Sequence, residues 1–268
     1  MLLMSFLNDH KVHCVSWQVQ YKDKIETHYK SNNFKAEDIK DNQTSELIER
    51  NFIQNFFDIT LPNYHTSPYR KEIKNGINCL TIRRKSVVEL TFLSYFQALE
   101  SLVLAYKRQN GIEFILDKVR FGRLRSKLEE TIKKELPLLK KERGKIYNKI
   151  NELNRLSFKE SAMLFLDQHS IEIGDTWPLF DDKKNNTTGL TTIRNVLIHG
   201  DLLPSDQLIN IAIASEHLRT ILIRCIFSLL GWELSKTKFS KKFIFERHHL
   251  FNPKVKNKAI YELNSYFK

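Results

Sequence analysis

The sequence predicts a mainly α-helical fold, in which a helical bundle follows a small N-terminal α/β segment. Two observations carry this prediction. From about residue 83 the apolar residues recur every three or four positions, whereas before residue 80 two short stretches alternate apolar with polar residues. Hydrophobic residues make up 41% of the 268-residue chain and charged residues 28%, so the chain can bury a core.

Residues 1–80 are expected to form a separate α/β module of unknown role. The stretch "VSWQVQY" alternates in the manner of a strand, and "KIETHY" follows after a short polar turn, which favours a hairpin. The stretch "SELIERNFIQNFF" has the pattern of a short helix. The dipeptide Asn75–Gly76 lies between Ile73 and Ile77 and predicts a second hairpin.

Residues 81–235 are expected to form a bundle of five or six helices. A long first helix is predicted by an apolar stripe that comprises Val88, Phe92, Tyr95, Leu99, Leu102 and Tyr106. A second helix is expected over 112–134, where Pro137 ends it. A third is expected over 139–155, with an inward face formed by Ile146, Ile150 and Leu153.

The later helices of the bundle are predicted from their end signals. Ser157 and Glu160 fit a capping box for a fourth helix that runs to about Gln168. After the polar loop "DDKKNNTTG", an apolar helix is expected from about 189 to 200. The last long helix is expected over 206–232, with Ser205 or Asp206 as its N-cap.

The charge of the chain favours a polyanionic partner, either nucleic acid or an anionic membrane surface. Lys and Arg number 43 against 31 Asp and Glu, which gives a formal net charge of +12. Residues 118–149 have a local net charge of +8. The C-terminal segment over 236–268 is also basic, and its residues 236–258 have a local net charge of +7. These clusters form either a contact surface for the RNA backbone or ordinary solvated helix faces. In the first interpretation the RNA-binding residues include Lys133, Lys134, Lys140 and Lys141.

Other function classes find little support in the sequence. The three cysteines are far apart and form no CxxC pair, so neither a thiolate zinc site nor a disulfide framework is predicted. His248 and His249 lack a suitably spaced third ligand, so no metal site is expected. The stretch "TILIRCIFSLLGW" is interrupted by Arg224 and is too short for a membrane span. We therefore expect a cytoplasmic protein without a membrane partner.

The stretch "TTIRNVLIHGDLLP" carries three polar side chains on an otherwise apolar helix. Asn195 and His199 are four residues apart and share a helical face, and the long side chain of Arg194 can reach the same edge. Arginine binds phosphate, and a histidine with a pKa of about 6.5 can exchange a proton at neutral pH. Asparagine can orient the imidazole or donate to a phosphate oxygen. With RNA the 2′-hydroxyl supplies the nucleophile, so this chemistry needs no metal or cofactor.

The stretch "RNVLIHG" resembles the R-x4-H motif of HEPN domains, in its R-N-x3-H form. "LSYFQALESLVL", which contains Glu100, resembles the first helix of the Apea-like HEPN subgroup. This resemblance covers about residues 83–232. It implies a HEPN-type bundle and a metal-independent endoribonuclease in which Arg194, Asn195 and His199 are catalytic. It also implies a homodimer with a composite active site, and a role in phage defence, a toxin–antitoxin pair or a CRISPR-associated system, where an antitoxin or regulatory partner is possible.

Several alternatives stay open at this point. Glu100 either serves as a support by pairing with Arg194 or another basic side chain, or lies at a partly exposed rim. His217 is expected in the core or at its rim. Asp201 stands where toxins controlled by adenylylation carry a tyrosine, which argues against that regulation. The motif could instead only stabilise the dimer of a non-catalytic HEPN protein that binds nucleic acid or a partner, or the enzyme could be silent until an effector binds.

Overall fold

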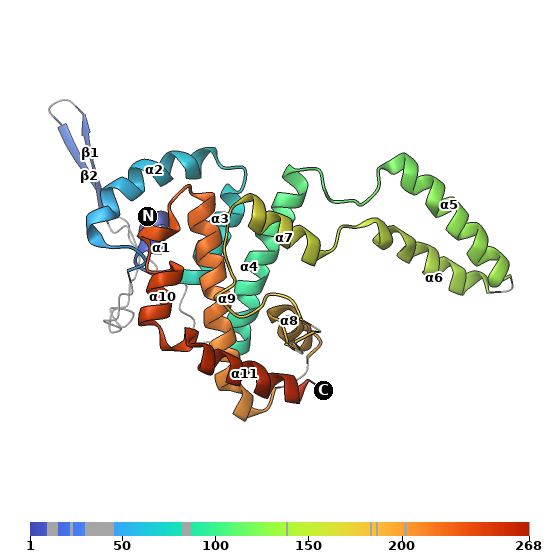
Figure 1. The fold of residues 1–268 in the computed structure, drawn as a ribbon. Coiled ribbons are helices and arrows are strands. Elements are labelled where there is room, and N and C mark those ends of the chain that lie inside the picture. Colours follow the sequence, from blue (N-terminus) through green and yellow to red (C-terminus); the bar gives the residue numbers. More distant parts are fainter. Residues whose placement is uncertain are drawn as a thin grey trace. The chain divides into compact units, whose positions relative to one another are not determined.

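The computed structural model describes residues 1–9, 16–21, 24–29, 46–81, 87–137, 139–182, 184–185, 187–200 and 203–267. The structure is 71% helical, and the described residues hold eleven α-helices and one two-stranded sheet (Figure 1), so the predicted mainly α fold is confirmed. The chain forms two compact units. The larger comprises Met1–Ser101 and His169–Lys268, and the smaller comprises Leu102–Gln168.

The predicted N-terminal hairpin is present. Strands β1 (Ser16–Tyr21) and β2 (Lys24–Tyr29) pair antiparallel, with Val19 opposite Glu26 and Gln20 opposite Ile25. Because directly opposite residues share a face, the apolar residues of the two strands lie on opposite faces of the sheet. The expected start of the first strand at Val15 lies outside the described residues.

The second predicted hairpin is wrong, because Asn75–Gly76 lies inside helix α3 (Arg70–Thr81). A side chain at Gly76 would place its Cβ 3.1 Å from Ile226 Cδ1, so the glycine permits close helix packing. Before α3 the chain forms α1 (Leu2–Leu7), a 3-10 turn (Arg50–Phe52) and α2 (Ile53–Thr66). The helix predicted for "SELIERNFIQNFF" therefore begins only at Ile53, in the second half of that stretch.

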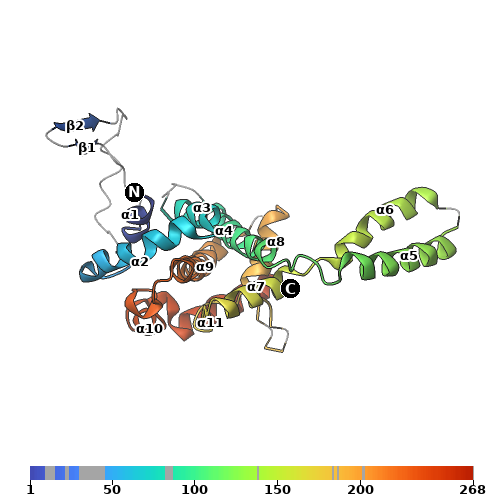
Figure 2. The ribbon, with the colours of Figure 1, turned by 90° about the horizontal axis from the view of Figure 1, so that it is seen from above.

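Helix α9 (Leu208–Leu229) is the central element of the larger unit. Both α3 and α11 pack against it, and Figure 2 shows α9 with α3 on one side and α10 and α11 on the other. Its buried residues surround the helix instead of forming one stripe, as expected for a helix in the middle of a core. Ser205 and Asp206 do not cap it: they form a 3-10 turn (Ser205–Gln207), and the N-cap is Gln207.

The predicted first helix of the bundle is α4 (Val88–Gln109), and its apolar stripe is buried from Phe92 onward, whereas Val88 is only half-buried. Among the described residues, α4 alone is long and apolar enough to cross a membrane by length and composition, and 44% of that window is buried within the protein. The core helix of a soluble protein passes the same test, so this composition does not by itself indicate a membrane protein.

The smaller unit contains α5 (Lys118–Glu135), α6 (Lys140–Ile150), a 3-10 turn (Asn151–Asn154) and α7 (Phe158–Gln168). Helix α5 begins later than predicted, because the Asp117 side chain accepts from the backbone of Val119 and Arg120, each at 2.9 Å. The predicted capping box is present, with Glu160 N donating to Ser157 Oγ at 3.1 Å and Ser157 N to Glu160 Oε2 at 3.2 Å.

The inward face predicted for the third helix is only partly correct. Ile150 is buried, but Ile146 is exposed and Leu153 is 65% exposed. Leu153 falls in the 3-10 turn, where the change of helical period rotates it out of the predicted stripe. With α8 and α9, the described part of the chain after residue 86 has six helices up to residue 229, as predicted.

The basic C-terminal segment is folded onto the larger unit. It contains α10 (Lys241–Arg247) and α11 (Pro253–Tyr266), and Ile244, Phe251 and Leu263 are buried. The domain boundaries at residues 80 and 235 stay predictions.

Candidate functional site

Helix α8 (Leu190–Ile198) carries the motif residues. Leu190 and Ile193 are fully buried and anchor the helix in the larger unit. His199 is the C-cap, and Gly200 follows with a φ of +85°, a left-handed conformation that terminates a helix and that glycine adopts readily. The anchored face and the glycine stop leave the other face of the last turn at the surface.

Arg194 is held by an ion pair with Glu100 of α4. The Nη2 atom lies 3.0 Å from Glu100 Oε1, and the two side chains are 30% and 32% exposed. The guanidinium also lies 6.0 Å from the centre of the Phe96 ring, and Nη1 donates to Asn195 Oδ1 at 3.1 Å. Of the two alternatives for Glu100, the structure thus has the ion pair with Arg194, on a carboxylate that is also partly exposed. Within the described residues the buried Nε of Arg194 has no hydrogen-bond partner.

Asn195 and His199 both lie at the surface. Because the Asn195 oxygen accepts from Arg194, the amide of Asn195 is oriented by the arginine and not by the imidazole. No residue that the structure describes forms a hydrogen bond with the His199 ring. The imidazole is thus accessible for proton exchange, and the Asn195 amide keeps donors for an anion. Asp201 lies outside the described residues.

The start of α8 is fixed by a carboxylate from the preceding loop. Asp181 accepts from Gly189 N at 2.7 Å and from the Thr192 hydroxyl at 2.8 Å, which satisfies a free donor at the helix start. Gly189 lies so close to this loop that a Cβ would stand 2.3 Å from the carbonyl carbon of Phe180. Only glycine fits there without moving the loop.

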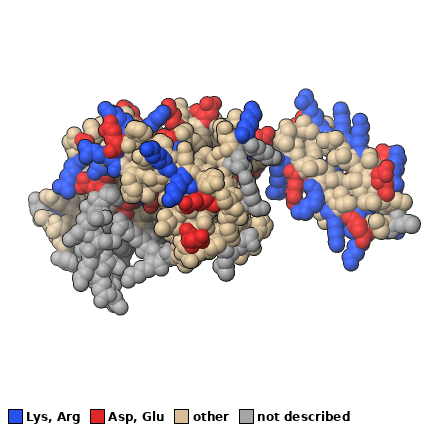
Figure 3. Space-filling view, turned by 60° about the horizontal axis from the view of Figure 1, so that its bottom comes forward, with Lys and Arg blue, Asp and Glu red and all other residues tan. Residues whose placement is uncertain are grey.

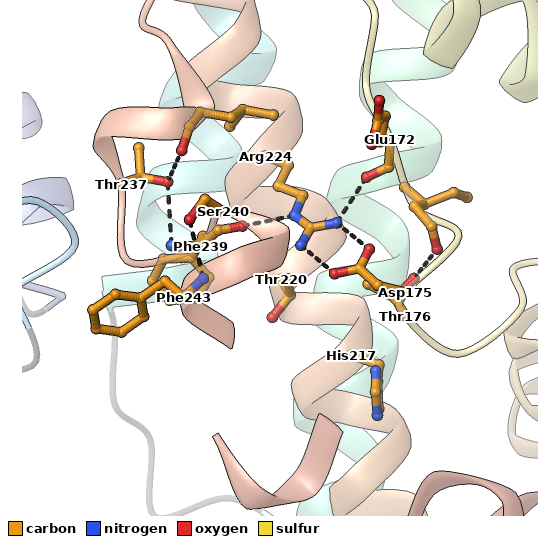
Figure 4. Close-up of polar contacts among 12 residues, drawn as sticks. Glu172, Asp175, Thr176, His217, Thr220, Arg224, Thr237, Phe239, Ser240 and Phe243 are labelled. Carbon is orange, nitrogen blue, oxygen red and sulfur yellow. Dashed lines mark hydrogen bonds and ion pairs between the residues drawn. The ribbon is translucent and has the colours of Figure 1, made fainter. Parts of the chain in front are cut away.

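The loop that precedes α8 is fixed in turn by a buried arginine of α9 (Figure 4). The Arg224 guanidinium donates twice to Asp175, each time at 2.6 Å, once to the Glu172 carbonyl at 2.7 Å and once to the Phe239 carbonyl at 2.9 Å. Burial by itself would raise the pKa of Asp175, but hydrogen bonds and charge from Arg224 hold the pKa below its usual value. This cluster ties the loop to α9 and to the C-terminal segment.

His217 and Trp177 form a second anchor for this loop. The backbone N–H of Trp177 donates to His217 Nδ1 at 3.1 Å, and His217 Nε2 lies 3.2 Å from the Leu250 carbonyl. This pairing requires a neutral ring with its proton on Nε2. Burial and the nearby Lys256 lower the pKa of His217 to about 3. The Trp177 indole donates to the Thr188 carbonyl at 2.9 Å, directly before α8. The expectation of a core histidine is confirmed.

The basic residues predicted to bind RNA belong to the smaller unit. Lys133, Lys134, Lys140 and Lys141 are all exposed, and Figure 3 shows Lys and Arg side chains around α5 and α6. Lys134 forms an exposed ion pair with Glu130 at 3.1 Å, a contact that adds little stability. The structure thus places these lysines in a different unit from Arg194, Asn195, His199 and Glu100.

Some residues that shape the site carry no sequence signal. Asp181 and Trp177 lie in stretches without a regular apolar pattern, and in the sequence Arg224 stands out only as a charged residue in an apolar run.

His248 and His249 have stacked rings with centroids 6.3 Å apart. Across the described ranges no group of three His, Cys, Asp or Glu side chains is arranged to hold a metal ion.

Comparison with known proteins gives one family match. The family described as Apea-like HEPN matches residues 93–236, a little over half of the chain. The matched region contains Glu100 and the whole of α8, together with α5, α6 and α9. No curated protein and no solved structure matches the chain.

Proposed function

Since this chain belongs to the Apea-like HEPN family, we propose that it is a metal-independent endoribonuclease whose catalytic residues are Arg194, Asn195 and His199. Family membership indicates a nuclease or nucleotide-binding role. The observation that carries the finer proposal is the geometry of α8. The exposed imidazole of His199 stands at the end of this helix and has no hydrogen-bond partner in the described part of the chain. Arg194 of the same helix is held by its ion pair with Glu100 of α4.

The proposed reaction uses the RNA itself as nucleophile. The 2′-oxygen attacks the adjacent phosphorus while His199 takes the 2′-hydroxyl proton. The bond to the 5′-oxygen breaks, and that oxygen leaves with a proton from a second acid. The products are a 2′,3′-cyclic phosphate and a 5′-hydroxyl. Arg194 and the Asn195 amide donate to the phosphate oxygens, where negative charge develops.

The second acid motivates a homodimer. One chain offers one His199, whereas cleavage benefits from both a base and an acid. Because a two-fold interface brings the same group from both chains together, a homodimer would supply the second histidine. Ile198, within the motif, is 50% exposed, as expected for a residue that another chain covers. In this arrangement the two copies of α8 line one shared cleft. The proposed setting is the cytoplasm, in phage defence or in a toxin–antitoxin or CRISPR-associated system with a possible antitoxin or regulatory partner.

The proposal is tested by incubating RNA with the purified protein in excess EDTA. We expect fragments with 2′,3′-cyclic phosphate ends, and we expect His199→Ala and Arg194→Ala to lose cleavage while they keep the helical circular dichroism of the wild type. His249→Ala is the matched control, since that histidine is outside the motif. A strict need for added metal, or full activity in both motif variants, would refute the proposal.

A further inference from the structure

The basic helices α5 and α6 join the rest of the smaller unit through a neck, defined here as residues 113–116 and 154–156. Its backbone is firmly paired. Ile115 N donates to the Asn154 carbonyl at 2.8 Å, and the Asn154 side chain binds both backbone groups of Leu116, at 2.7 and 2.9 Å. Asn154 is buried, and its two side-chain bonds are partly buried. Side chains on the neck are therefore displayed from a fixed backbone.

One of these side chains is an exposed aromatic ring beside a cation. Phe114 is 58% exposed and forms an antiparallel bridge with Arg155. Directly opposite residues of such a bridge project to the same side, so the Phe114 ring and the exposed Arg155 side chain are neighbours. Within the described residues Phe114 stacks on no other ring, and Arg155 has no acidic partner.

The helices beyond the neck supply uncompensated positive charge. Residues 118–149 hold twelve Lys and Arg against four Glu. Of these cations, seven are exposed and, among the described residues, form no ion pair: Lys118, Arg123, Lys127, Lys133, Lys140, Lys141 and Lys145. Helix α5 has 18 residues, so its basic surface extends for about 27 Å, which is long enough to follow several phosphates of a nucleic-acid strand.

We propose that the neck is a binding site for single-stranded RNA, in which an unpaired base stacks on Phe114 and Arg155 contacts an adjacent phosphate. The cations of α5 and α6 hold the continuing backbone. An aromatic platform beside a basic surface is the combination that binds single strands with little sequence preference. A base within a duplex has both faces covered by its neighbours, so it cannot stack on the ring.

This inference rests on the proposed ribonuclease function, because it names the strand that the enzyme holds. Its test measures binding without cleavage. A fluorescent 2′-O-methyl oligoribonucleotide lacks the nucleophile, and its binding to the full chain is compared with that of the corresponding duplex. We expect Phe114→Ala to weaken single-strand binding by about 5- to 150-fold, with little effect on the duplex. Phe114→Trp should retain binding, while Phe114→Leu should lose it.

Two controls separate stacking from other effects. Leu153→Ala removes an exposed apolar side chain next to the neck and should leave binding unchanged. Reversing the charge of Lys133, Lys134, Lys140 and Lys141 should make the slope of log affinity against log salt shallower, whereas Phe114→Ala should not alter that slope.

The neck site is overturned if Phe114→Ala binds the single strand as tightly as the wild type. It is also overturned if the variant loses single strand and duplex equally, or if it changes the oligomeric state in sedimentation, since the ring would then cover a protein interface. If any of these results is found while the wild type still cleaves RNA, the ribonuclease proposal remains intact and only the neck site is rejected. Failure of the wild type both to bind and to cleave RNA would remove both proposals.

Discussion

Arg194 of α8 and Glu100 of α4 are 94 positions apart in the sequence and form an ion pair of 3.0 Å. Because both side chains are about one-third exposed, water screens the pair, and it contributes at most about 1 kcal/mol to stability. Its main effect is therefore on position. It fixes the direction of the guanidinium at the surface of α8, next to Asn195.

We expect Glu100→Gln to change stability little and to lower RNA cleavage by up to about 100-fold, because a small displacement of a catalytic group is costly. Single-turnover cleavage and thermal unfolding measure the two effects. Glu46→Gln is the matched control, since Glu46 also pairs with an arginine, Arg50, at 2.8 Å. Equal cleavage by wild type and Glu100→Gln would show that the ion pair does not orient the arginine.

We expect Gly189→Ala to destabilise the protein by about 1–3 kcal/mol, because the new Cβ overlaps the backbone at Phe180. The loop or the start of α8 must move, so cleavage should fall as well. Gly174→Ala is the control, because a Cβ there meets nothing within 4 Å. Urea unfolding measures the difference, and equal midpoints for the two variants would contradict the close approach.

We expect Arg224→Met to cost about 3–5 kcal/mol, because it leaves Asp175 charged and unpaired in a mostly buried position. Adding Asp175→Leu to the same chain should recover part of that loss, since the unpaired charge is then removed. Denaturant unfolding of the single and double variants measures this. A double variant that is less stable than Arg224→Met would show that the hydrogen bonds to the carbonyls matter more than the charge.

Acid is expected to destabilise the fold through His217. Its pKa is lowered from 6.5 to about 3, so between these values the unfolded chain binds a proton that the folded chain does not. The contribution of His217 is complete above pH 6.5 and is lost as the pH falls toward 3, by an amount on the order of 5 kcal/mol. His217→Gln should be less stable at pH 7 but show a flatter decline below pH 6.5. Parallel curves of stability against pH would contradict this role.

Subunit mixing tests the shared cleft. Arg194→Ala and His199→Ala homodimers should both be inactive. Their heterodimer retains one Arg194 and one His199 on different chains, so mixing should restore part of the cleavage if the site is composite. The control is each variant alone at the same total protein concentration as the mixture. A monomer that cleaves at full specific activity on dilution would exclude the composite site.

The sequence by itself determined the helical class, the capping box at Ser157 and the short motif helix that stops before Gly200. These features depend on local period and on hydrogen bonds between residues three or four positions apart, so they can be read from the chain. For the same reason the spacing of Arg194, Asn195 and His199 was enough to group them on one short helix.

The tertiary structure alone decided the role of residues whose partners are distant in sequence. Asn75–Gly76 has the local signature of a hairpin, yet contact with Ile226 places it in a helix, because burial against α9 outweighs a weak turn preference. Asp181 and Arg224 became supports of α8 only when folding brought their carbonyl, amide and carboxylate partners within hydrogen-bond distance. A buried charge requires such partners, and which residues supply them depends on the packing of the whole unit.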